Sequence, residues 1–242
     1  MSRSKGTFVS ETCRFSIIIP VLHESKSINT LLDSLESLKS DDPFEIIVVD
    51  GSPTQDTIQV ISRDNVMKYA SPQGRGRQMN EGAAHATGGI LVFLHADTFL
   101  PPDALSLIRT TLADQRFVGG AFSLGIRSKN PILTLIAHGS TLRSRFTRAP
   151  YGDQVIFLRT SFFKNLGGFS NLPLMEDVEL MRRVRKKGGR IFILSTRVMT
   201  SDRRWRKEGF LYTTVRDLLI IFLYWCGMSA EKLAKYYPSH TE

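Results

Sequence analysis

Three carboxylates follow apolar segments in the first hundred residues of the sequence. Glu24 comes after the run FSIIIP, Asp50 ends EIIVVD, and Asp97 follows ILVFL as the last residue of His-Ala-Asp. An anion at the edge of an apolar core is costly unless something cationic meets it. Because Mg²⁺ and Mn²⁺ bind carboxylate oxygens, Asp97 is a candidate ligand for a divalent cation. The structural alternative is that Asp97 caps a helix.

A second group of acids, Glu176 and Asp177, begins the predicted helix 175–189. A carboxylate can act as a general base toward a hydroxyl group. A neighbouring acid can raise the pKa of such a base and keep it poised. Acids in the first turn of a helix also stabilise its dipole. The pattern therefore leaves a catalytic and a structural interpretation open.

Basic residues give the chain a formal net charge of +9 and gather late, in 181–190 and 203–207. Such clusters attract nucleic acid, an anionic membrane surface or substrate phosphates, and they can also be the solvated face of a helix. No helix-turn-helix, zinc-finger or RNP pattern accompanies them. We therefore expect no nucleic-acid partner.

The first 115 residues alternate apolar strands with amphipathic helices. Strands are expected at 15–20, 45–50, 65–70 and 90–97, and helices at 28–38, 77–87 and 103–113. This alternation predicts a parallel sheet covered on both faces. Ligands of open α/β sheets bind beyond the carboxyl ends of the strands. Glu24, Asp50 and Asp97 all fall at or just past such ends.

The pattern changes after about residue 115. A Gly-containing strand, a helix, a basic loop, a strand, a long helix and a last strand are expected at 117–126, 131–142, 143–150, 153–163, 175–189 and 190–195. The tail is mostly helical, and its apolar run 218–226 is too short to span a bilayer. That run is either a packed helix or a helix at a membrane surface. No linker is visible, so we expect a single domain over 1–242.

The two cysteines, Cys13 and Cys226, lie far apart without metal-ligand spacing. They fit a reducing compartment and leave one bridge open. The first fourteen residues contain no apolar h-region, so no secretory signal is expected. We predict a cytoplasmic protein, with peripheral contact to the inner face of the membrane as an open alternative.

Six ordered motifs together resemble the family 2 inverting glycosyltransferases. They are IIIPVLHE, IIVVDGSPTQDT, GRGRQMNEGA, LVFLHADT, GGF followed by MEDVEL, and RRW. The resemblance covers about residues 14–209 and is nearest to a small bacterial subgroup with a GRxxQMNxG-like segment and His-Ala-Asp in the metal position. It implies a GT-A type α/β fold, with a Rossmann-like, mostly parallel sheet flanked by helices and a helical tail. It divides the chain into a nucleotide-sugar-binding half (14–115), an acceptor half (116–209) and the tail (210–242).

The resemblance also implies roles on the donor side. Pro20 and Glu24 would line the nucleoside pocket, and Asp50 would accept a hydrogen bond from the base, with Ser52 beside it. Arg75 would reach a phosphate or the base, and Asn80 would face the sugar-nucleotide. The family's usual asparagine is replaced here by His23.

Further implied roles concern the reaction itself. Mg²⁺ or Mn²⁺ would bind Asp97, with His95 either as a direct or water-mediated ligand or as a residue that orients the loop. Asp177 would be the general base, with Glu176 as its neighbour. Arg204 would neutralise diphosphate oxygens, and Trp205 would stack on a sugar or the acceptor, although the glutamine that the family places before Arg-Trp is missing.

We therefore expect a metal-dependent inverting glycosyltransferase that moves a sugar from a nucleotide-sugar, a UDP-sugar by family precedent, to a hydroxyl or carboxyl group. The apolar tail beside a basic stretch favours a lipophilic acceptor. One rival is a nucleotidyltransferase, but PVLHESKS is not the Gly-rich loop it needs. The other is a binding protein at anionic membranes without turnover. A dinucleotide-binding loop fits poorly, because Met79 replaces its third glycine and the segment follows the third strand instead of the first.

Overall fold

The computed structural model describes residues 14–237. Residues 1–13, which include Cys13, and residues 238–242 at the end of the tail lie outside the described residues. The sheet contains β1 (Phe15–Val21), β2 (Phe44–Asp50), β3 (Val66–Ala70), β4 (Ile90–Phe93), β5 (Thr98–Phe99), β6 (Phe117–Arg127), β7 (Ile156–Arg159) and β8 (Arg190–Ser201). The helices are α1 (Ile28–Glu36), α2 (Asp56–Gln59), α3 (Arg75–His85), α4 (Ala104–Ala113), α5 (Pro131–Thr147), η1 (Gly152–Gln154), α6 (Thr160–Leu166), α7 (Glu176–Lys186), α8 (Arg203–Glu208), α9 (Phe210–Trp225) and α10 (Ala230–Ala234).

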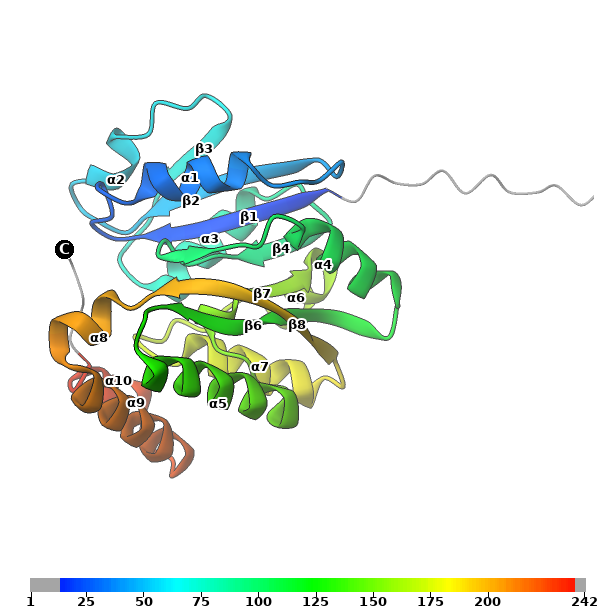
Figure 1. Cartoon of the computed structure of the whole chain (residues 1–242). Helices are drawn as coiled ribbons and strands as arrows, with labels where there is room; N and C mark the ends of the chain where they lie inside the picture. Colours follow the sequence, from blue (N-terminus) through cyan, green and yellow to red (C-terminus); the bar gives the residue numbers. More distant parts are fainter. Residues whose placement is uncertain (1–13, 238–242) are drawn as a thin grey trace, which may run out of the picture.

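One sheet runs through the molecule in the order β3-β2-β1-β4-β7-β6-β8-β5 (Figure 1). Strands β1 to β4 are parallel to their neighbours within that group, as the alternating sequence predicts. The second half is mixed, because β7 runs antiparallel to β4 and β6, and β5 runs antiparallel to β8. The sheet is thus uniformly parallel in its first half, and β6 and β8 add a further parallel pair in its second half.

Helices cover both faces of the sheet. The apolar side chains of α1, Ile28, Leu31, Leu32 and Leu35, are fully buried. They pack with α4 against one face, and α3, α6 and α7 pack against the other. Full burial of such an aliphatic side chain is worth about 1.5–3 kcal/mol, so α1 and α4 hold the first four strands firmly in place.

The strand predicted over 153–163 is wrong in its length. Only β7 is extended, because its partner β4 offers four residues for pairing. The backbone N–H of Thr160 then donates to Gly89 O at 3.0 Å, and the chain turns into α6. Phe163 in that helix packs against Phe93 and Phe169.

Other boundaries also differ from the prediction. The strand expected over 90–97 ends at Phe93, and the helix expected over 175–189 ends at Lys186. Helix α5 continues to Thr147, so most of the basic segment 143–150 is helical rather than a loop. Strand β8 continues past 195 to Ser201, because β6 and β5 both pair with its second half. The longer strand carries the chain directly into α8. Figure 1 shows α8, α9 and α10 gathered at one end of the sheet, at the lower left.

Candidate functional site

A cavity of about 450 Å³ lies at the carboxyl ends of β1, β4 and β8. This is the edge at which open α/β sheets bind ligands. Eight of the residues predicted from sequence line it: Pro20, Glu24, Arg75, His95, Asp97, Asp177, Arg204 and Trp205. The cavity thus brings together segments from both halves of the chain.

Asp97 lies in the tight turn between β4 and β5. Thr98 N donates to His95 O at 3.1 Å to close the turn, and Ser201 N at the end of β8 donates to Asp97 O at 3.0 Å. Within residues 14–237, the Asp97 carboxylate accepts a side-chain hydrogen bond only from the Thr98 hydroxyl, at 3.3 Å. Helix α4 begins at Ala104, so Asp97 caps no helix. Burial raises the pKa of Asp97, against the opposing effect of Arg203.

Glu24 and Arg203 form an ion pair across this edge. The Arg203 guanidinium donates to both Glu24 oxygens, at 2.5 and 3.1 Å. Glu24 is buried at 8% exposure, and bidentate pairs of this kind are the stronger ones. The pair fastens the end of β1 to the start of α8. Sequence reasoning selected Arg204 from the RRW motif and missed its neighbour Arg203.

Gly152 lies between His95 and Asp177. Its N–H donates to Asp177 Oδ2 at 2.6 Å. A Cβ at this position would lie 2.7 Å from His95 Nε2 and 3.5 Å from Asp177 Oδ2. Only glycine therefore lets the imidazole and the carboxylate approach the same backbone. Burial, with Arg75 and Arg204 adding to it and Asp177 opposing, lowers the pKa of His95 to about 4, so the ring is neutral at pH 7.

Asp153 is a cavity residue that sequence reasoning missed. Its Oδ1 is buried and has no hydrogen-bond partner among the described residues. Burial raises the pKa of Asp153 to about 6, and the neighbouring Asp177 adds to the shift. Its position just before a buried strand was the only signal in the sequence, and many structural aspartates share that position.

Arg75 and Glu176 pair at the start of α3 and α7. Arg75 Nε lies 2.9 Å from Glu176 Oε1, and the Glu176 side chain is 3% exposed. Burial raises the pKa of Glu176, with Arg75 opposing and Asp177 reinforcing the rise. Glu176 is not a lining residue, whereas Arg75 is. Glu176 thus holds Arg75 at the cavity wall.

Arg204 and Trp205 line the cavity from α8. Arg204 pairs with Asp217 of α9 at 2.7 Å and donates a hydrogen bond to the Tyr237 hydroxyl. Its guanidinium lies 5.1 Å from the Trp205 ring centroid. Trp205 also packs in a small cluster with β6 and α5. The tail is therefore a wall of the cavity and not a separate appendage.

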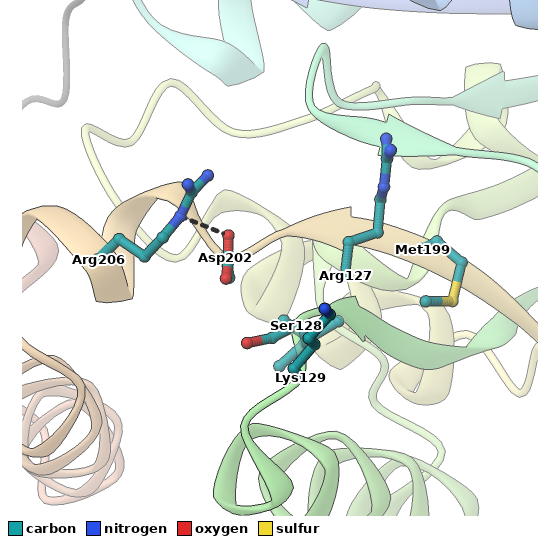
Figure 2. Close-up of a pocket in the computed structure, with 7 residues that line it drawn as sticks. Arg127, Ser128, Lys129, Met199, Asp202 and Arg206 are labelled. Atoms are coloured by element: carbon teal, nitrogen blue, oxygen red, sulfur yellow. Dashed lines mark ion pairs between the residues drawn. The ribbon is translucent and has the colours of Figure 1, made fainter.

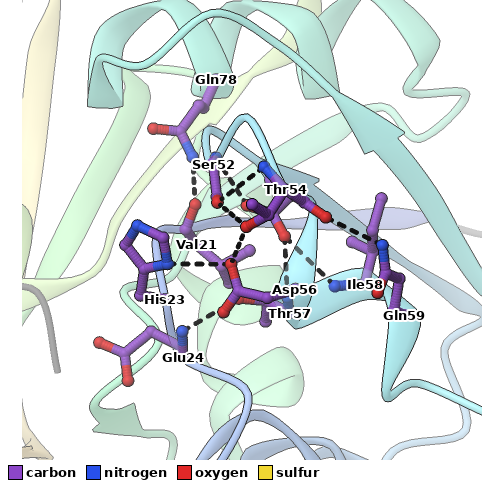
Figure 3. Close-up of polar contacts among 11 residues, drawn as sticks. Val21, His23, Glu24, Ser52, Thr54, Asp56, Thr57, Ile58, Gln59 and Gln78 are labelled. Atoms are coloured by element: carbon purple, nitrogen blue, oxygen red, sulfur yellow. Dashed lines mark hydrogen bonds and ion pairs between the residues drawn. The ribbon is translucent and has the colours of Figure 1, made fainter.

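Asp50 and Ser52 lie outside the lining residues of the cavity. The Asp50 oxygens accept hydrogen bonds from the backbone N–H groups of Ser52 at 2.8 Å, Thr57 at 3.0 Å and Ile58 at 3.3 Å. The Ser52 hydroxyl bonds to Thr54, which donates to Asp56 (Figure 3). These contacts give both residues a complete structural role in the loop before α2.

His23 and Asn80 also make contacts within the protein. His23 Nδ1 lies 2.9 Å from Asp56 Oδ1, a contact drawn in Figure 3. Asn80 accepts from Phe169 N and donates to Phe169 O, both at 2.8 Å. Asn80 therefore joins α3 to the loop before α7, and it is not among the residues that line the cavity.

A model of the family described as Glycosyl transferase family 2 matches residues 16–164, which is more than half of the chain. The chain belongs to glycosyl transferase family 2. The resemblance stated from the ordered motifs is thereby confirmed at the level of the family.

Curated relatives in this family match over shorter stretches. The poly(ribitol-phosphate) beta-N-acetylglucosaminyltransferase TarS of Staphylococcus aureus is 30% identical over 102 residues, covering 38% of this chain and 18% of that protein. Glucosyl-3-phosphoglycerate synthase of Mycolicibacterium smegmatis is 26% identical over 99 residues, covering 37% and 32%. The matched segments span less than a third of either relative.

Solved structures of other glycosyltransferases share the fold. The mannosyltransferase PcManGT from Pyrobaculum calidifontis, in complex with GDP-Man and Mn²⁺, aligns with a TM-score of 0.65 at 21% identity, over 93% of this chain and 69% of that one. Residues 1–349 of S. aureus TarS with UDP align at 0.63 and 20% identity, over 78% and 60%. These alignments confirm the GT-A type α/β fold expected for a family 2 chain.

The side chains at the β4–β5 turn of this family 2 site can be tested against the ligands that a divalent metal ion needs. Among residues 14–237 no group of three or more His, Cys, Asp or Glu side chains is placed to hold a metal ion. Asp97 has unused acceptor capacity, and the neutral ring of His95 is the form that binds metals. Mg²⁺ and Mn²⁺ commonly bind one or two carboxylates together with phosphate oxygens and waters. The residues present therefore fit such an ion.

The family 2 chain has a second hollow, which is shallow and open. Arg127, Ser128, Lys129, Met199 and Arg206 contribute to its lining, and Arg206 pairs with Asp202 at 2.7 Å (Figure 2). The Arg127 guanidinium lies 4.7 Å from the centroid of the Phe99 ring. Its basic side chains are exposed or already paired, and none of the residues predicted from sequence lines it.

Proposed function

We propose that the chain is a metal-dependent inverting glycosyltransferase that moves a sugar from a nucleotide-sugar donor to an acceptor hydroxyl or carboxyl group. The supporting observation is the cavity, where Asp97 and His95 from the β4–β5 turn face the same space as Asp177 from α7. UDP and GDP-Man occupy structures of the same fold. Family precedent favours a UDP-sugar as the donor.

The donor would lie along the polar side of the cavity. Asp97 and His95 would hold Mg²⁺ or Mn²⁺, which, when bound, offsets the negative charge of the departing diphosphate. Arg75 and Arg204 line the same cavity and would add positive charge around the phosphates. Pro20 and Glu24 would border the nucleoside. Asp50, Ser52 and Asn80 would support that border from behind, since their side chains contact backbone and loop groups.

Asp177 would act as the base in a single displacement. Its carboxylate takes the proton of the acceptor hydroxyl while the hydroxyl oxygen forms a bond to the anomeric carbon, and the bond to the diphosphate oxygen breaks. One displacement inverts the anomeric configuration. The N–H of Gly152, at 2.6 Å from Asp177 Oδ2, fixes the direction of the carboxylate. A positioned base contributes about 10²–10⁴-fold in rate.

Part of the cavity lining is apolar. It consists of Leu174 and Met175 just before α7, Val178 of α7, and Ile220 and Ile221 of α9. Such a wall suits an acceptor with an apolar portion, because it removes apolar surface of the ligand from water. We propose a lipophilic acceptor and a cytoplasmic setting with peripheral contact to the inner face of the membrane.

Product analysis tests the proposal. Purified protein is incubated with Mn²⁺ and a panel of UDP- and GDP-sugars, and the released nucleotide is identified. Glycosyl transfer or slow donor hydrolysis releases the nucleoside diphosphate. A nucleotidyltransferase would instead transfer the nucleoside monophosphate of the donor and release the sugar 1-phosphate. A binding protein without turnover would be stabilised thermally by a donor and release neither product.

A further inference from the structure

Helix α9 presents its hydrophobic side chains outward. Seven large side chains of the helix are more than half exposed: Leu211, Tyr212, Val215, Leu218, Leu219, Phe222 and Trp225. They recur at helical spacing and form one stripe along the whole helix, which we call the α9 face. Soluble monomers rarely expose a continuous apolar surface of this kind unless it serves an interaction.

The polar residues of α9 point the other way. Its two charged residues are Arg216, 7% exposed, and Asp217, 23% exposed at the side chain. Arg216 pairs with Glu208 at 2.7 Å and with Asp217 at 3.2 Å, and Asp217 also pairs with Arg204. These inward ion pairs fix the rotation of the helix. The outward position of the α9 face is therefore enforced by the interior.

An ordinary amphipathic helix of the same chain shows the contrast. In α1 the residues Ile28, Leu31, Leu32 and Leu35 are buried, and the solvent side carries Thr30, Asp33 and Glu36. Helix α9 reverses this arrangement. A reversed helix at the surface is suited to an apolar phase outside the protein.

The length of α9 limits how it can meet such a phase. Its 16 residues extend about 24 Å at 1.5 Å per residue, which is shorter than the hydrocarbon core of a bilayer. No helix among the described residues is long and apolar enough to cross a membrane. The α9 face can instead lie along the interface, with its apolar side chains in the boundary between headgroups and acyl chains.

Basic side chains flank both ends of the helix. Arg206 and Lys207 precede α9, Lys232 and Lys235 follow it, and all four are exposed. Lysine and arginine beside an apolar stripe attract anionic headgroups. The net charge of +9 acts in the same direction. A second copy of the chain is a poorer occupant, because it would bring two sets of like charges together.

We propose that the α9 face docks the protein on an anionic lipid bilayer. The same helix lines the cavity through Asp217, Ile220 and Ile221 on its other side. Docking therefore places the apolar wall of the cavity beside the lipid. Resting on the proposed function, this geometry assigns the acceptor to the class of membrane-held amphiphiles that carry a hydroxyl or carboxyl group near the headgroup level.

Vesicle co-sedimentation of the full chain tests the docking. The vesicles contain either phosphatidylcholine alone or phosphatidylcholine with one-third phosphatidylglycerol. We expect the wild type to pellet with the anionic vesicles and far less with the neutral ones. The double variant L218E/F222E should lose about tenfold or more in partitioning, because two inserted side chains become charged.

Val60→Glu supplies the matched control. Val60 is also an exposed apolar residue, at 42%, but it follows α2 at the opposite end of the molecule from α9 (Figure 1). This variant should pellet like the wild type. Wild-type protein that stays in solution with anionic vesicles, or equal pelleting of L218E/F222E, would overturn the proposal.

Tryptophan fluorescence gives a second readout. Of the two tryptophans, Trp225 belongs to the α9 face and Trp205 is buried. A blue shift on adding anionic vesicles is expected in the wild type and absent in Trp225→Phe. If the wild type instead forms a dimer that L218E/F222E abolishes, and no blue shift occurs, a second copy is the occupant and the lipid proposal is wrong.

The test separates docking from catalysis. Asp177→Asn should pellet like the wild type, because its carboxylate is not part of the α9 face. Vesicle binding without release of nucleoside diphosphate from any donor would leave docking intact and contradict the proposed function. Nucleotide release without vesicle binding would support the proposed function and contradict docking.

Discussion

Two groups of carboxylates at the same edge of the sheet differ in how completely the protein satisfies them. In the loop before α2, Asp50 accepts three backbone N–H groups and is fully buried. In the cavity, the Asp97 carboxylate accepts one long side-chain hydrogen bond, and one Asp153 oxygen has no partner, among the described residues. Acids whose hydrogen bonds are complete stabilise the fold, and acids left incomplete are available to a ligand.

This difference predicts opposite outcomes for substitutions in the two groups. Changes in the cavity should abolish activity and leave stability unchanged or improved. Changes in the loop should reduce stability first.

The largest effect is expected for Asp177→Asn. Loss of the base should lower the transfer rate by about 10²–10⁴-fold while the nucleotide affinity is retained. The rate is measured as release of nucleoside diphosphate, and the affinity by calorimetry. The exposed Asp64→Asn is the control and should be as active as the wild type. Full activity of Asp177→Asn would remove the base assignment.

Asp97→Ala should remove the contribution of Mn²⁺ to the binding of nucleoside diphosphate. In the presence of Mn²⁺, the affinity of the variant should be lower than that of the wild type by about tenfold or more. Titrations with and without Mn²⁺ separate the metal-dependent part from the rest. Affinity without the metal should be the same in variant and wild type. If Mn²⁺ strengthens binding equally in both proteins, Asp97 is not a metal ligand.

Asp50→Ala should destabilise the protein. Three buried N–H groups lose their acceptor, at about 1 kcal/mol or more each, so the free energy of unfolding should fall by about 3 kcal/mol. For a chain of this size that corresponds to a decrease in Tm of about 6–12 °C. A melting curve like that of the wild type, with loss of nucleotide binding, would show that Asp50 serves the donor rather than the loop.

Asp153→Asn should stabilise the protein at neutral pH. The folded pKa of Asp153 is raised from 3.8 to about 6, so the folded state binds its proton more tightly than the unfolded state. As the pH rises from about 4 to 6, the Asp153 carboxylate therefore lowers the free energy of unfolding. Above pH 6 this destabilisation is complete and no longer changes with pH. The variant should gain about 1–3 kcal/mol at pH 8 and nothing below pH 4. His95 titrates in both proteins, so their difference isolates Asp153. Thermal melts at both pH values in EDTA measure this gain, and an equal Tm at pH 8 would contradict it.

The smallest effect is expected for Gly152→Ala, at about tenfold in kcat. The added methyl would lie 2.7 Å from His95 Nε2, so the ring must move, and misplacement within a site lowers the rate. Gly139→Ala is matched, because a Cβ there meets nothing within 4 Å. Equal kcat values for the two variants would show that the position of His95 does not affect the reaction.

The sequence predicted the first half of the fold better than the second. Strands β1 and β2 are mostly apolar runs with Pro20 and Asp50 at or next to their ends, so pattern alone locates them. Strand β8 alternates exposed and buried residues, and its second half is held by pairing with β6 and β5. Long-range pairing leaves no local signal, which is why the predicted strand stopped at 195.

The sequence predicted those residues of the candidate site that lie in recognisable motifs. His95, Asp97 and Asp177 lie in recognisable segments, and all three line the cavity. Arg203 and Asp153 were missed because their importance comes from contacts distant in sequence, with Glu24 in one case and Asp177 in the other. The rotation of α9 could not be predicted either, since its inward ion pairs involve α8.

The ion pair between Glu24 and Arg203 joins two points 179 positions apart in the chain. During synthesis, the early carboxylate is made long before its cationic partner leaves the ribosome. The contacts that Arg204 makes with Asp217 and Tyr237 form later still. A nascent polypeptide can thus assemble its first parallel strands while it remains unable to enclose a substrate.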